Sequence, residues 1–256
     1  MLQKEAIMII DTHCHLDNKK FIDDVDEVIK RAEEVGVKKF IIPAADPADL
    51  PRAIELSEKY NDIYFAVGVH PVDIDKYEDS LLIDYINHPK CVAVGEIGLD
   101  YHWVKEKSKQ EKQKEFFKRQ IEIALEHNKP IIVHVREATK DSYDIVKEYP
   151  TINGVFHCYN AAHQLLDFSD RFYYGIGGVI TFKNARKLLE VFPKIPKNKV
   201  LIETDSPYLT PHPFRGKRNE PMYTIYIRDK IANLWGVSKE EVEEITTKNA
   251  LRLFKL

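Results

Sequence analysis

The sequence predicts a single (β/α)8 barrel, and three observations support this fold class. The chain has 256 residues, close to the length of about 250 residues that one such barrel typically occupies. Eight short apolar runs follow one another along it, and amphipathic stretches of helical period separate most of them. An open parallel sheet is the alternative fold, but a count of eight strands favours closure into a barrel.

The eight apolar runs are the predicted strands, taken in chain order. They cover residues 6–11, 37–44, 63–69, 91–95, 130–135, 154–157, 172–177 and 199–204. Their nearly continuous apolar character is typical of strands in a parallel sheet that is covered by helices. Between the fourth and fifth predicted strands, Phe117, Ile121, Ala124 and Leu125 have the i, i+4, i+7, i+8 spacing of a buried helix face.

The bulk composition predicts one globular domain over residues 1–256. Hydrophobic residues make up 44% and charged residues 31% of the chain, which leaves little room for disorder. No repeat or Gly/Ser-rich linker divides it. The formal net charge of −3 means that a polyanionic partner must be held by a local patch or by metal ions. The dense charge run of residues 105–118 has mixed signs and suits a solvated loop and helix start.

The cysteines and the N-terminus indicate a cytoplasmic protein. Cys14, Cys91 and Cys158 are few and widely spaced, which is not the pattern of a disulfide framework. The apolar stretch of residues 6–10 is shorter than the core of a signal peptide. No run of about 18 apolar residues predicts a membrane span. We therefore expect a reducing compartment and no membrane contact.

Histidines and carboxylates stand at the ends of five predicted strands. The set comprises His13, His15, Glu96, His134, His157 and Asp205. His13 and His15 project from one face of the first strand, because alternate residues of a strand share a face. The carboxyl ends of barrel strands meet around one pocket. Each residue alone is more often a core histidine or an ion-pair partner, but six concordant positions predict a metal centre.

The donor set predicts two divalent ions per chain. Four imidazoles and two carboxylates exceed the roughly three protein ligands of one catalytic ion, so we expect Glu96 to bridge a pair. Such a pair activates water near neutral pH and holds both oxygens of an in-line displacement, which suits phosphodiester cleavage. Asp205 is the expected general base, and Glu96 is the second catalytic residue. For His70, ligation, support of a ligand and substrate contact all stay open.

A basic loop follows the last predicted strand. Residues 213–221 read PFRGKRNEP and contain Arg215, Lys217 and Arg218. By charge alone, a solvated turn explains this loop equally well. Its place beside the predicted centre makes the three cations, together with His70, candidates for substrate binding, since Arg and Lys can clamp phosphate oxygens. Gly216 would let the backbone approach a ligand closely.

Six segments of the chain together resemble the TatD family of metal-dependent deoxyribonucleases, within the amidohydrolase-like barrels. They are IDTHCHLD (10–17), GEIGLDY (95–101), HVR (134–136), GVFHC (154–158), ETDSPY (203–208) and RGKRNEP (215–221). The resemblance implies the same six metal ligands. It also implies hydrolysis of DNA, exonuclease action on single strands and a requirement for magnesium, whereas histidine-rich sites suit zinc, manganese or iron. We expect DNA as the partner and no obligate protein partner.

Two departures from the family pattern concern substrate contacts. Tyr159, Asn160 and Ala161 follow Cys158 where the family usually has an aromatic, a serine and a glycine, and Val72 stands where a further histidine is common. No stacking aromatics occur at a readable spacing, so we expect binding of single strands to rest on phosphate contacts.

Two alternatives to a nuclease stay open. One is a metal-dependent amidohydrolase or esterase that acts on a small molecule, and the other is a barrel without catalysis. Many amidohydrolase-like barrels have a lysine, available for carboxylation, at the position of Glu96. The glutamate favours the nuclease-like branch.

Overall fold

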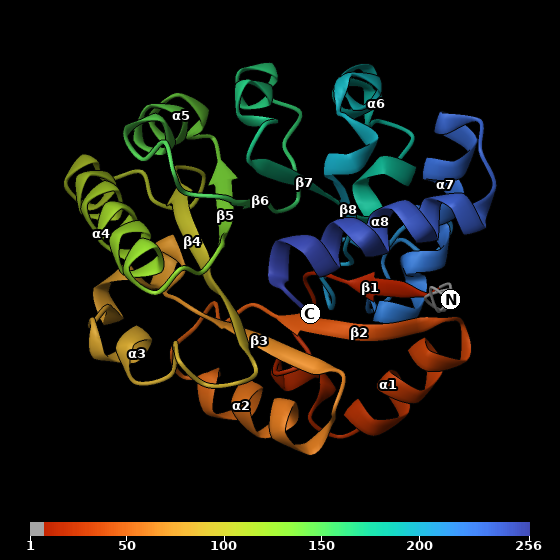
Figure 1. Cartoon of the computed structure of the whole chain (residues 1–256), viewed down its shortest axis with the longest axis horizontal. Coiled ribbons are helices and arrows are strands. Elements are labelled where there is room, and N and C mark those ends of the chain that lie inside the picture. Colours follow the sequence, from red (N-terminus) through yellow and green to blue (C-terminus); the bar gives the residue numbers. More distant parts are fainter. Residues whose placement is uncertain (1–7) are drawn as a thin grey trace, which may run out of the picture.

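The computed structural model describes residues 8–256, and its centre is one sheet of eight parallel strands (Figure 1). The strands are β1 (Ile9–Asp11), β2 (Val37–Ile42), β3 (Ile63–Val67), β4 (Cys91–Asp100), β5 (Ile131–Arg136), β6 (Gly154–Phe156), β7 (Phe172–Ile176) and β8 (Val200–Ile202). Each strand pairs with the next one in the chain. The predicted (β/α)8 barrel is thereby confirmed.

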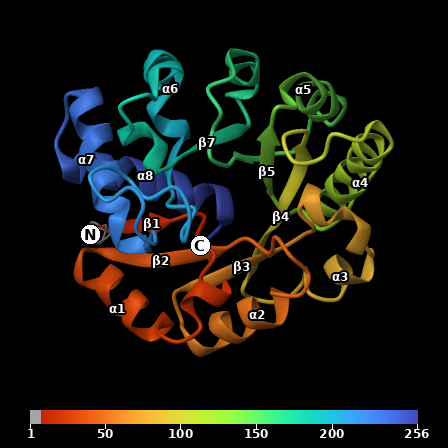
Figure 2. The ribbon, with the colours of Figure 1, turned by 180° about the vertical axis from the view of Figure 1, so that it is seen from behind.

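Helices surround this sheet, as both views show (Figures 1 and 2). The α-helices are α1 (Val25–Glu34), α2 (Leu50–Lys59), α3 (Ser80–Ile83), α4 (Lys107–Glu126), α5 (Thr139–Glu148), α6 (Arg186–Val191), α7 (Thr224–Trp235) and α8 (Lys239–Phe254). Short 3-10 turns are η1 (Lys19–Phe21), η2 (Pro71–Lys76), η3 (His163–Phe168), η4 (Gly178–Thr181), η5 (Phe192–Lys194), η6 (Lys197–Lys199) and η7 (Pro221–Tyr223). On α4, Phe117, Ile121 and Ala124 are fully buried, as their spacing predicts, whereas Leu125 is only partly buried against the same core.

Polar groups join the first and last strands and bring the barrel close to closure. The Thr12 amide donates to the Ile202 carbonyl at 3.1 Å, and Cys14 forms an isolated parallel bridge with Ser206. The buried Asp11 carboxylate accepts from the Thr204 amide and hydroxyl at 2.9 and 2.6 Å. These contacts hold the end of β1, which precedes the histidine pair, against the end of β8.

The first and fourth strands differ from the predicted runs in what the structure describes. Residues 6 and 7 of the first predicted strand lie outside the described residues. Strand β4 was expected to end at Gly95 but continues to Asp100, because its pairing with β5 runs on to the Asp100–Arg136 pair. Glu96 therefore lies within β4 rather than beyond its end. All residues of β4, including those that follow Glu96, are buried.

A small apolar cluster fills the barrel interior. Its members from the strands are Ile10, Ile41, Ala66, Val92, Ala93, Ile132, Val155, Tyr173 and Leu201. Leu253 and Phe254 of α8 pack on this cluster, and Thr247 of α8 donates to the Met8 carbonyl just before β1. Helix α8 thus covers the amino-terminal end of the barrel. The polar residues lie at the opposite, carboxyl end of the strands, where a functional site can form.

Within residues 8–256, none of the helices combines the length and the apolar character needed to cross a bilayer.

Candidate metal centre

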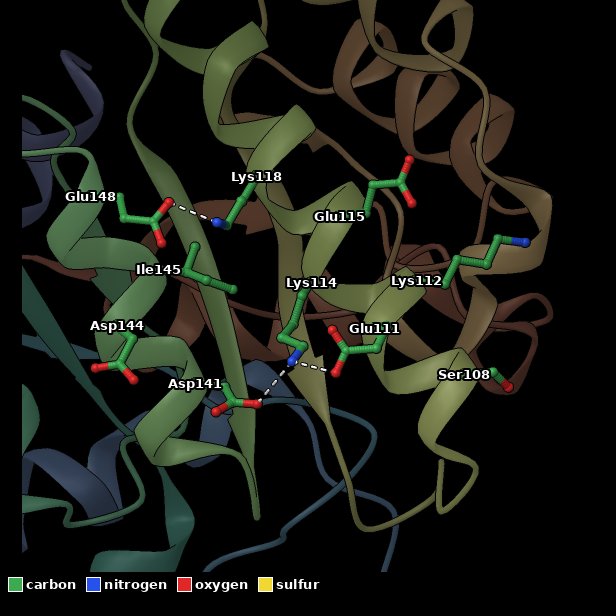
Figure 3. Close-up of a pocket in the computed structure, with 10 residues that line it drawn as sticks. All are labelled: Ser108, Glu111, Lys112, Lys114, Glu115, Lys118, Asp141, Asp144, Ile145 and Glu148. Atoms are coloured by element: carbon green, nitrogen blue, oxygen red, sulfur yellow. Dashed lines mark hydrogen bonds and ion pairs between the residues drawn. The ribbon is translucent and has the colours of Figure 1, made fainter.

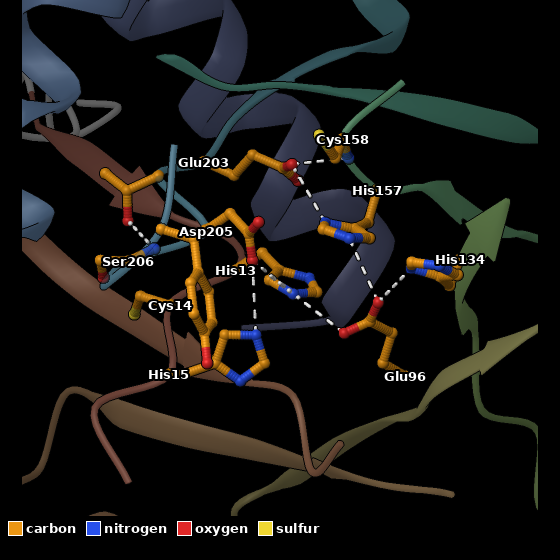
Figure 4. A network of polar contacts seen from close by, with 12 residues as sticks. His13, Cys14, His15, Glu96, His134, His157, Cys158, Glu203, Asp205 and Ser206 are labelled. Carbon is orange, nitrogen blue, oxygen red and sulfur yellow. Dashed lines mark hydrogen bonds and ion pairs between the residues drawn. The ribbon is translucent and has the colours of Figure 1, made fainter. Parts of the chain in front are cut away.

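The Glu96 carboxylate is the hub of a buried cluster at the carboxyl end of the barrel (Figure 4). Its Oε1 lies 2.8 Å from His134 Nδ1, 3.2 Å from His157 Nε2 and 3.5 Å from His70 Nε2. Its Oε2 lies 3.3 Å from His13 Nε2. The two oxygens of one carboxylate therefore face histidines from different strands, which is the arrangement that a bridging ligand requires.

Asp205 extends the cluster from the other side of the barrel mouth. Its Oδ1 lies 3.4 Å from His15 Nε2 and 3.6 Å from His13 Nε2. The chain turns sharply after β8, with Asp205 in the left-handed region at a φ of 56°, and the Asp205 amide donates to the His13 carbonyl at 2.8 Å. A non-glycine residue in this region is uncommon and concentrates at functional sites. The turn aims the carboxylate at the His13–His15 pair.

The buried ring of His13 lies near two carboxylates, with its Nε2 3.3 Å from Glu96 and 3.6 Å from Asp205, but forms no aligned hydrogen bond with either of them. It stacks on His157 with 3.7 Å between ring centroids, and neither of its ring nitrogens makes a hydrogen bond to the residues that the structure describes. Burial lowers the pKa of His13, and the repulsion of His157 adds to this. Buried polar groups without a partner are rare in native proteins. A neutral imidazole with a free lone pair is the form that binds a cation.

The charges of the cluster also fit divalent cations. Burial by itself would raise the pKa of Glu96, but His157, His70 and His13 hold it well below its usual range. Burial likewise opposes ionisation of Asp205, but the bond from His15 and the positive charges of His157, His13 and His15 together outweigh it, so the pKa of Asp205 is lowered. Two carboxylates are thus ionised in a site that is shielded from water. Histidine donors with ionised carboxylates match the donor set of zinc and manganese.

The surroundings of His157 favour a positive charge at this position. Burial disfavours its charge, but the negative charges of Glu96 and Glu203 raise the pKa of His157 well above its usual value. Its ring lies between these two carboxylates, at 3.2 Å from each. Since metal ligands must be deprotonated, a cation bound here would displace this proton.

Two groups of three side chains place their ligand atoms within 4.8 Å of one another and share Glu96. One is His13, His15 and Glu96, and the other is Glu96, His134 and His157. Asp205 adjoins the first group through His15. The structure therefore brings together all six residues that the strand-end pattern singles out, and it adds His70 at the edge of the second group.

Two carboxylates of the cluster have no assigned role in the sequence reasoning. Glu203 Oε1 accepts from the Cys158 amide at 2.6 Å and lies 3.2 Å from His157 Nδ1. Asp100 Oδ2 lies 3.0 Å from His134 Nε2. Each contacts the histidine nitrogen that does not face Glu96, which is how carboxylates fix the orientation of metal-bound histidines. Their presence at the ends of β8 and β4 was the signal that could have found them.

A glycine makes room for Glu203. A Cβ atom added at Gly175 in β7 would lie 2.1 Å from Glu203 Oε2. Any other residue at this position would displace the carboxylate from His157. The small residue in β7 therefore serves the centre, although it carries no functional group.

The basic loop lies outside the buried cluster. Arg218 is bound by Asp24 at 2.6 Å and by Glu220 at 2.8 Å, so its guanidinium holds the loop on the start of α1. Arg215 lies over the Phe182 ring at 3.8 Å, and Lys217 lies near Phe214. Among residues 8–256, none of the three cations contacts the cluster. Of the predicted substrate-binding residues, only His70 is joined to it.

The loop is nevertheless tied to the end of β8. The Asn219 side-chain amide donates to the Thr204 carbonyl at 2.8 Å, one residue before Asp205. Arg215 and Lys217 have no acidic partner within the described part of the chain. They remain exposed cations on a loop that is anchored beside the centre.

Comparisons with known proteins agree with this geometry. The family model described as TatD related DNase matches residues 10–255. The chain is 45% identical to the uncharacterized metal-dependent hydrolase YabD of Bacillus subtilis, over 97% of this chain and all of that protein. It is 36% identical to the uncharacterized metal-dependent hydrolase YcfH of Escherichia coli K12, over 98% of this chain and 97% of that protein.

The fold matches a solved structure of the same family. The crystal structure of YjjV, a TatD homologue from Escherichia coli K12, superposes with a TM-score of 0.89 at 28% identity, covering 97% of this chain and 98% of that one. The family match, the two relatives and the barrel all lead to one assignment. The chain belongs to the TatD family of metal-dependent hydrolases.

Proposed function

We propose that this protein is a deoxyribonuclease that hydrolyses DNA phosphodiester bonds, as an exonuclease that prefers single strands. The observation that carries the proposal is the position of Glu96, which the His13–His15 group and the His134–His157 group share. Two divalent ions per chain, of magnesium, manganese or zinc, would fill these groups with Asp205 as the sixth ligand. The description of the matching family as DNases supports DNA as the substrate.

The bound ions would supply an activated water near neutral pH and positive charge for the attacking and leaving oxygens. We assign to Asp205 the role of accepting the proton of that water; its lowered pKa and the 15% of its side-chain surface exposed at the mouth support this. A positioned base of this kind typically contributes about 10²- to 10⁴-fold to the rate. Glu96, at 4% exposure, stays fixed beneath it.

Exposed cations on the anchored loop support a polyanionic substrate. We assign phosphate contacts to Arg215 and Lys217, which carry no ion pair among residues 8–256. Arg218 supports them by fixing the loop through Asp24 and Glu220. His70 borders the site through Glu96 and is proposed to face the substrate side of the second group. All three cysteines are free, which supports a reducing, cytoplasmic setting.

Cleavage of end-labelled single-stranded DNA tests the proposal. Protein stripped of metal is supplied separately with magnesium, manganese or zinc, and the products are resolved by length over time. We expect a ladder that shortens from one end, only with metal, and a loss of about 10²- to 10⁴-fold in rate for Asp205→Asn. Absence of products with every ion, in protein shown to bind metal, would reject the nuclease.

An apolar cavity beside the centre favours a second candidate, hydrolysis of a small amide or ester. A space of about 600 Å³ has Cys158, Tyr159, Gly175, Val179 and Leu188 among its lining residues. Cavities of this size and character suit small ligands. Replacing Arg215 and Lys217 by glutamine separates the candidates. The change should weaken DNA cleavage and flatten its salt dependence, since two phosphate contacts are lost, whereas it should leave hydrolysis of a neutral ester unaltered.

A further inference from the structure

One large aromatic side chain stands in the solvent at the mouth of the barrel. Trp103 lies in the loop between β4 and α4 and is 67% exposed, more than any other large apolar residue that the structure describes. Its neighbours in the loop are His102 and Val104, and Lys105 follows. It is a single exposed indole and not part of a wide apolar patch of the kind that marks protein interfaces.

The loop holds this indole at a fixed place relative to the metal centre. The Trp103 amide donates to Asp100 Oδ1 at 2.8 Å, and the other oxygen of Asp100 lies 3.0 Å from His134 Nε2. His134 in turn contacts Glu96 at 2.8 Å. The Gln110 side chain of α4 donates to the Val104 carbonyl at 2.8 Å. The backbone of Trp103 is therefore connected through one carboxylate to a residue of the centre.

A guanidinium accompanies the ring. Arg136 ends β5 and its Cζ lies 5.5 Å from the centre of the Trp103 ring. The acid next to it, Glu137, is engaged by His102 at 2.7 Å and Lys105 at 3.1 Å. Arg136 itself has no acidic partner within residues 8–256. The loop thus offers a flat apolar face with an uncompensated positive charge beside it.

We propose that Trp103 and Arg136 form a platform for one unpaired nucleobase and its phosphate. The inference rests on the proposed function and explains its preference for single strands. An indole stacks on any base, and such stacking is sequence-tolerant because every base has a π-face. Inside a duplex these faces are covered by neighbouring pairs, so the platform favours an unpaired nucleotide. Phosphate contacts alone would not make this distinction.

Fluorescence of Trp103 provides the test. The chain has two tryptophans. Trp235, the last residue of α7, packs on Phe192. The Trp235→Phe variant therefore keeps Trp103 as its only indole. This metal-loaded protein is titrated with a dodecamer of thymidine in phosphorothioate form, which resists cleavage. A dodecamer with the same backbone and no bases is the matched ligand. We expect quenching and tighter binding with the thymidine strand and little quenching with the abasic one.

Substitutions at the platform complete the experiment. Trp103→Ala should weaken binding of the thymidine strand by about 5- to 150-fold without changing binding of the abasic strand, measured by fluorescence anisotropy of end-labelled strands. Trp103→Phe should recover part of the loss. Equal affinities of the wild type for both strands, or an equal effect of Trp103→Ala on both, would overturn the platform. So would a change of oligomeric state in Trp103→Ala, since that would make Trp103 an interface residue.

This test is separate from that of the nuclease. If no metal supports cleavage while the thymidine strand is still bound through Trp103, the proposed hydrolysis fails and the platform stands. If cleavage occurs but the thymidine and abasic strands bind alike, the proposed hydrolysis stands and the platform fails.

Discussion

Two charge-rich regions of this barrel differ in burial and in how their charges are paired. A groove of about 640 Å³ between α4 and α5 is lined almost entirely by charged side chains (Figure 3). There Lys114 meets Glu111 at 2.5 Å and Asp141 at 3.5 Å, and Lys118 meets Glu148 at 2.7 Å. Each cation faces an acid in contact with water, and such exposed pairs contribute little.

The metal centre uses the same residue classes in the opposite way. Glu96 and His13 are buried, and His13 keeps two ring nitrogens without a hydrogen bond among the described residues. Buried histidine and carboxylate groups without hydrogen-bond partners therefore indicate a site for chemistry, whereas a count of charges does not. The following changes test this distinction, from the centre outwards.

The largest effect is expected for Glu96→Gln. The amide removes the charge that the histidines of both groups share, so the variant should bind metal poorly and lose on the order of 10³-fold or more in DNA cleavage. Initial rates on end-labelled single strands measure this loss. Glu111→Gln in the α4–α5 groove is the matched control and should keep the rate. A Glu96→Gln protein with wild-type activity would remove the basis of the comparison.

A smaller loss is expected for Asp100→Asn. The amide can still contact His134 but no longer supplies the negative charge that favours one orientation and protonation of its ring. Loss of such a supporting carboxylate typically costs about 10- to 100-fold in metal affinity or activity. Metal titration with a competing chelator measures the affinity. An unchanged dissociation constant would show that Asp100 serves only the Trp103 loop.

The half-exposed pair of Asp24 and Arg218 should give an intermediate, pH-dependent effect on stability. The bond from Arg218 lowers the pKa of Asp24 below its ordinary value of 3.8, although burial opposes this. A depressed folded-state pKa stabilises the fold above pH 3.8, and this contribution disappears as the pH falls below it. The difference in melting temperature between wild type and Asp24→Asn should shrink from pH 6 to pH 3. A difference that grows towards low pH would contradict the pairing.

The smallest effect is expected in the groove itself. Lys118→Met removes one exposed ion pair with Glu148 and should change the free energy of unfolding by no more than about 0.5 kcal/mol. Urea denaturation followed by circular dichroism measures it, and DNA cleavage should stay at the wild-type rate. A large loss in either property would mean that this groove is a second functional region.

Sequence reasoning reached the strands and the six ligand candidates because both follow simple patterns. Apolar runs of strand length marked the barrel. His157 closes one such run, Asp205 directly follows another, and His13 and His15 come within four residues of the end of the first. Glu96 was found although its strand runs on to Asp100, because it follows the apolar run of residues 91–95. Strand ends converge in a barrel, so no knowledge of side-chain positions was needed.

The remaining parts of the site depend on three-dimensional contacts that no local pattern encodes. Asp100 reaches His134 across the β4–β5 pair, and Glu203 fits only because β7 has Gly175 beneath it. Arg218 is similar in sequence context to Arg215, yet Asp24, far away in the chain, binds it. Trp103 acquires its neighbour Arg136 from the next strand. Sequence could not rank these residues because their roles come from partners elsewhere in the fold.

Metal stoichiometry tests the central claim that Glu96 joins two cation sites. Metal-stripped protein is loaded with manganese, the bound metal per chain is measured by mass spectrometry, and the electron paramagnetic resonance spectrum reports whether bound ions are coupled. The two histidine groups that share Glu96 predict two coupled ions per chain in the wild type and at most one, uncoupled, in Glu96→Gln. A single ion in the wild type, or two ions retained in Glu96→Gln, would contradict the account.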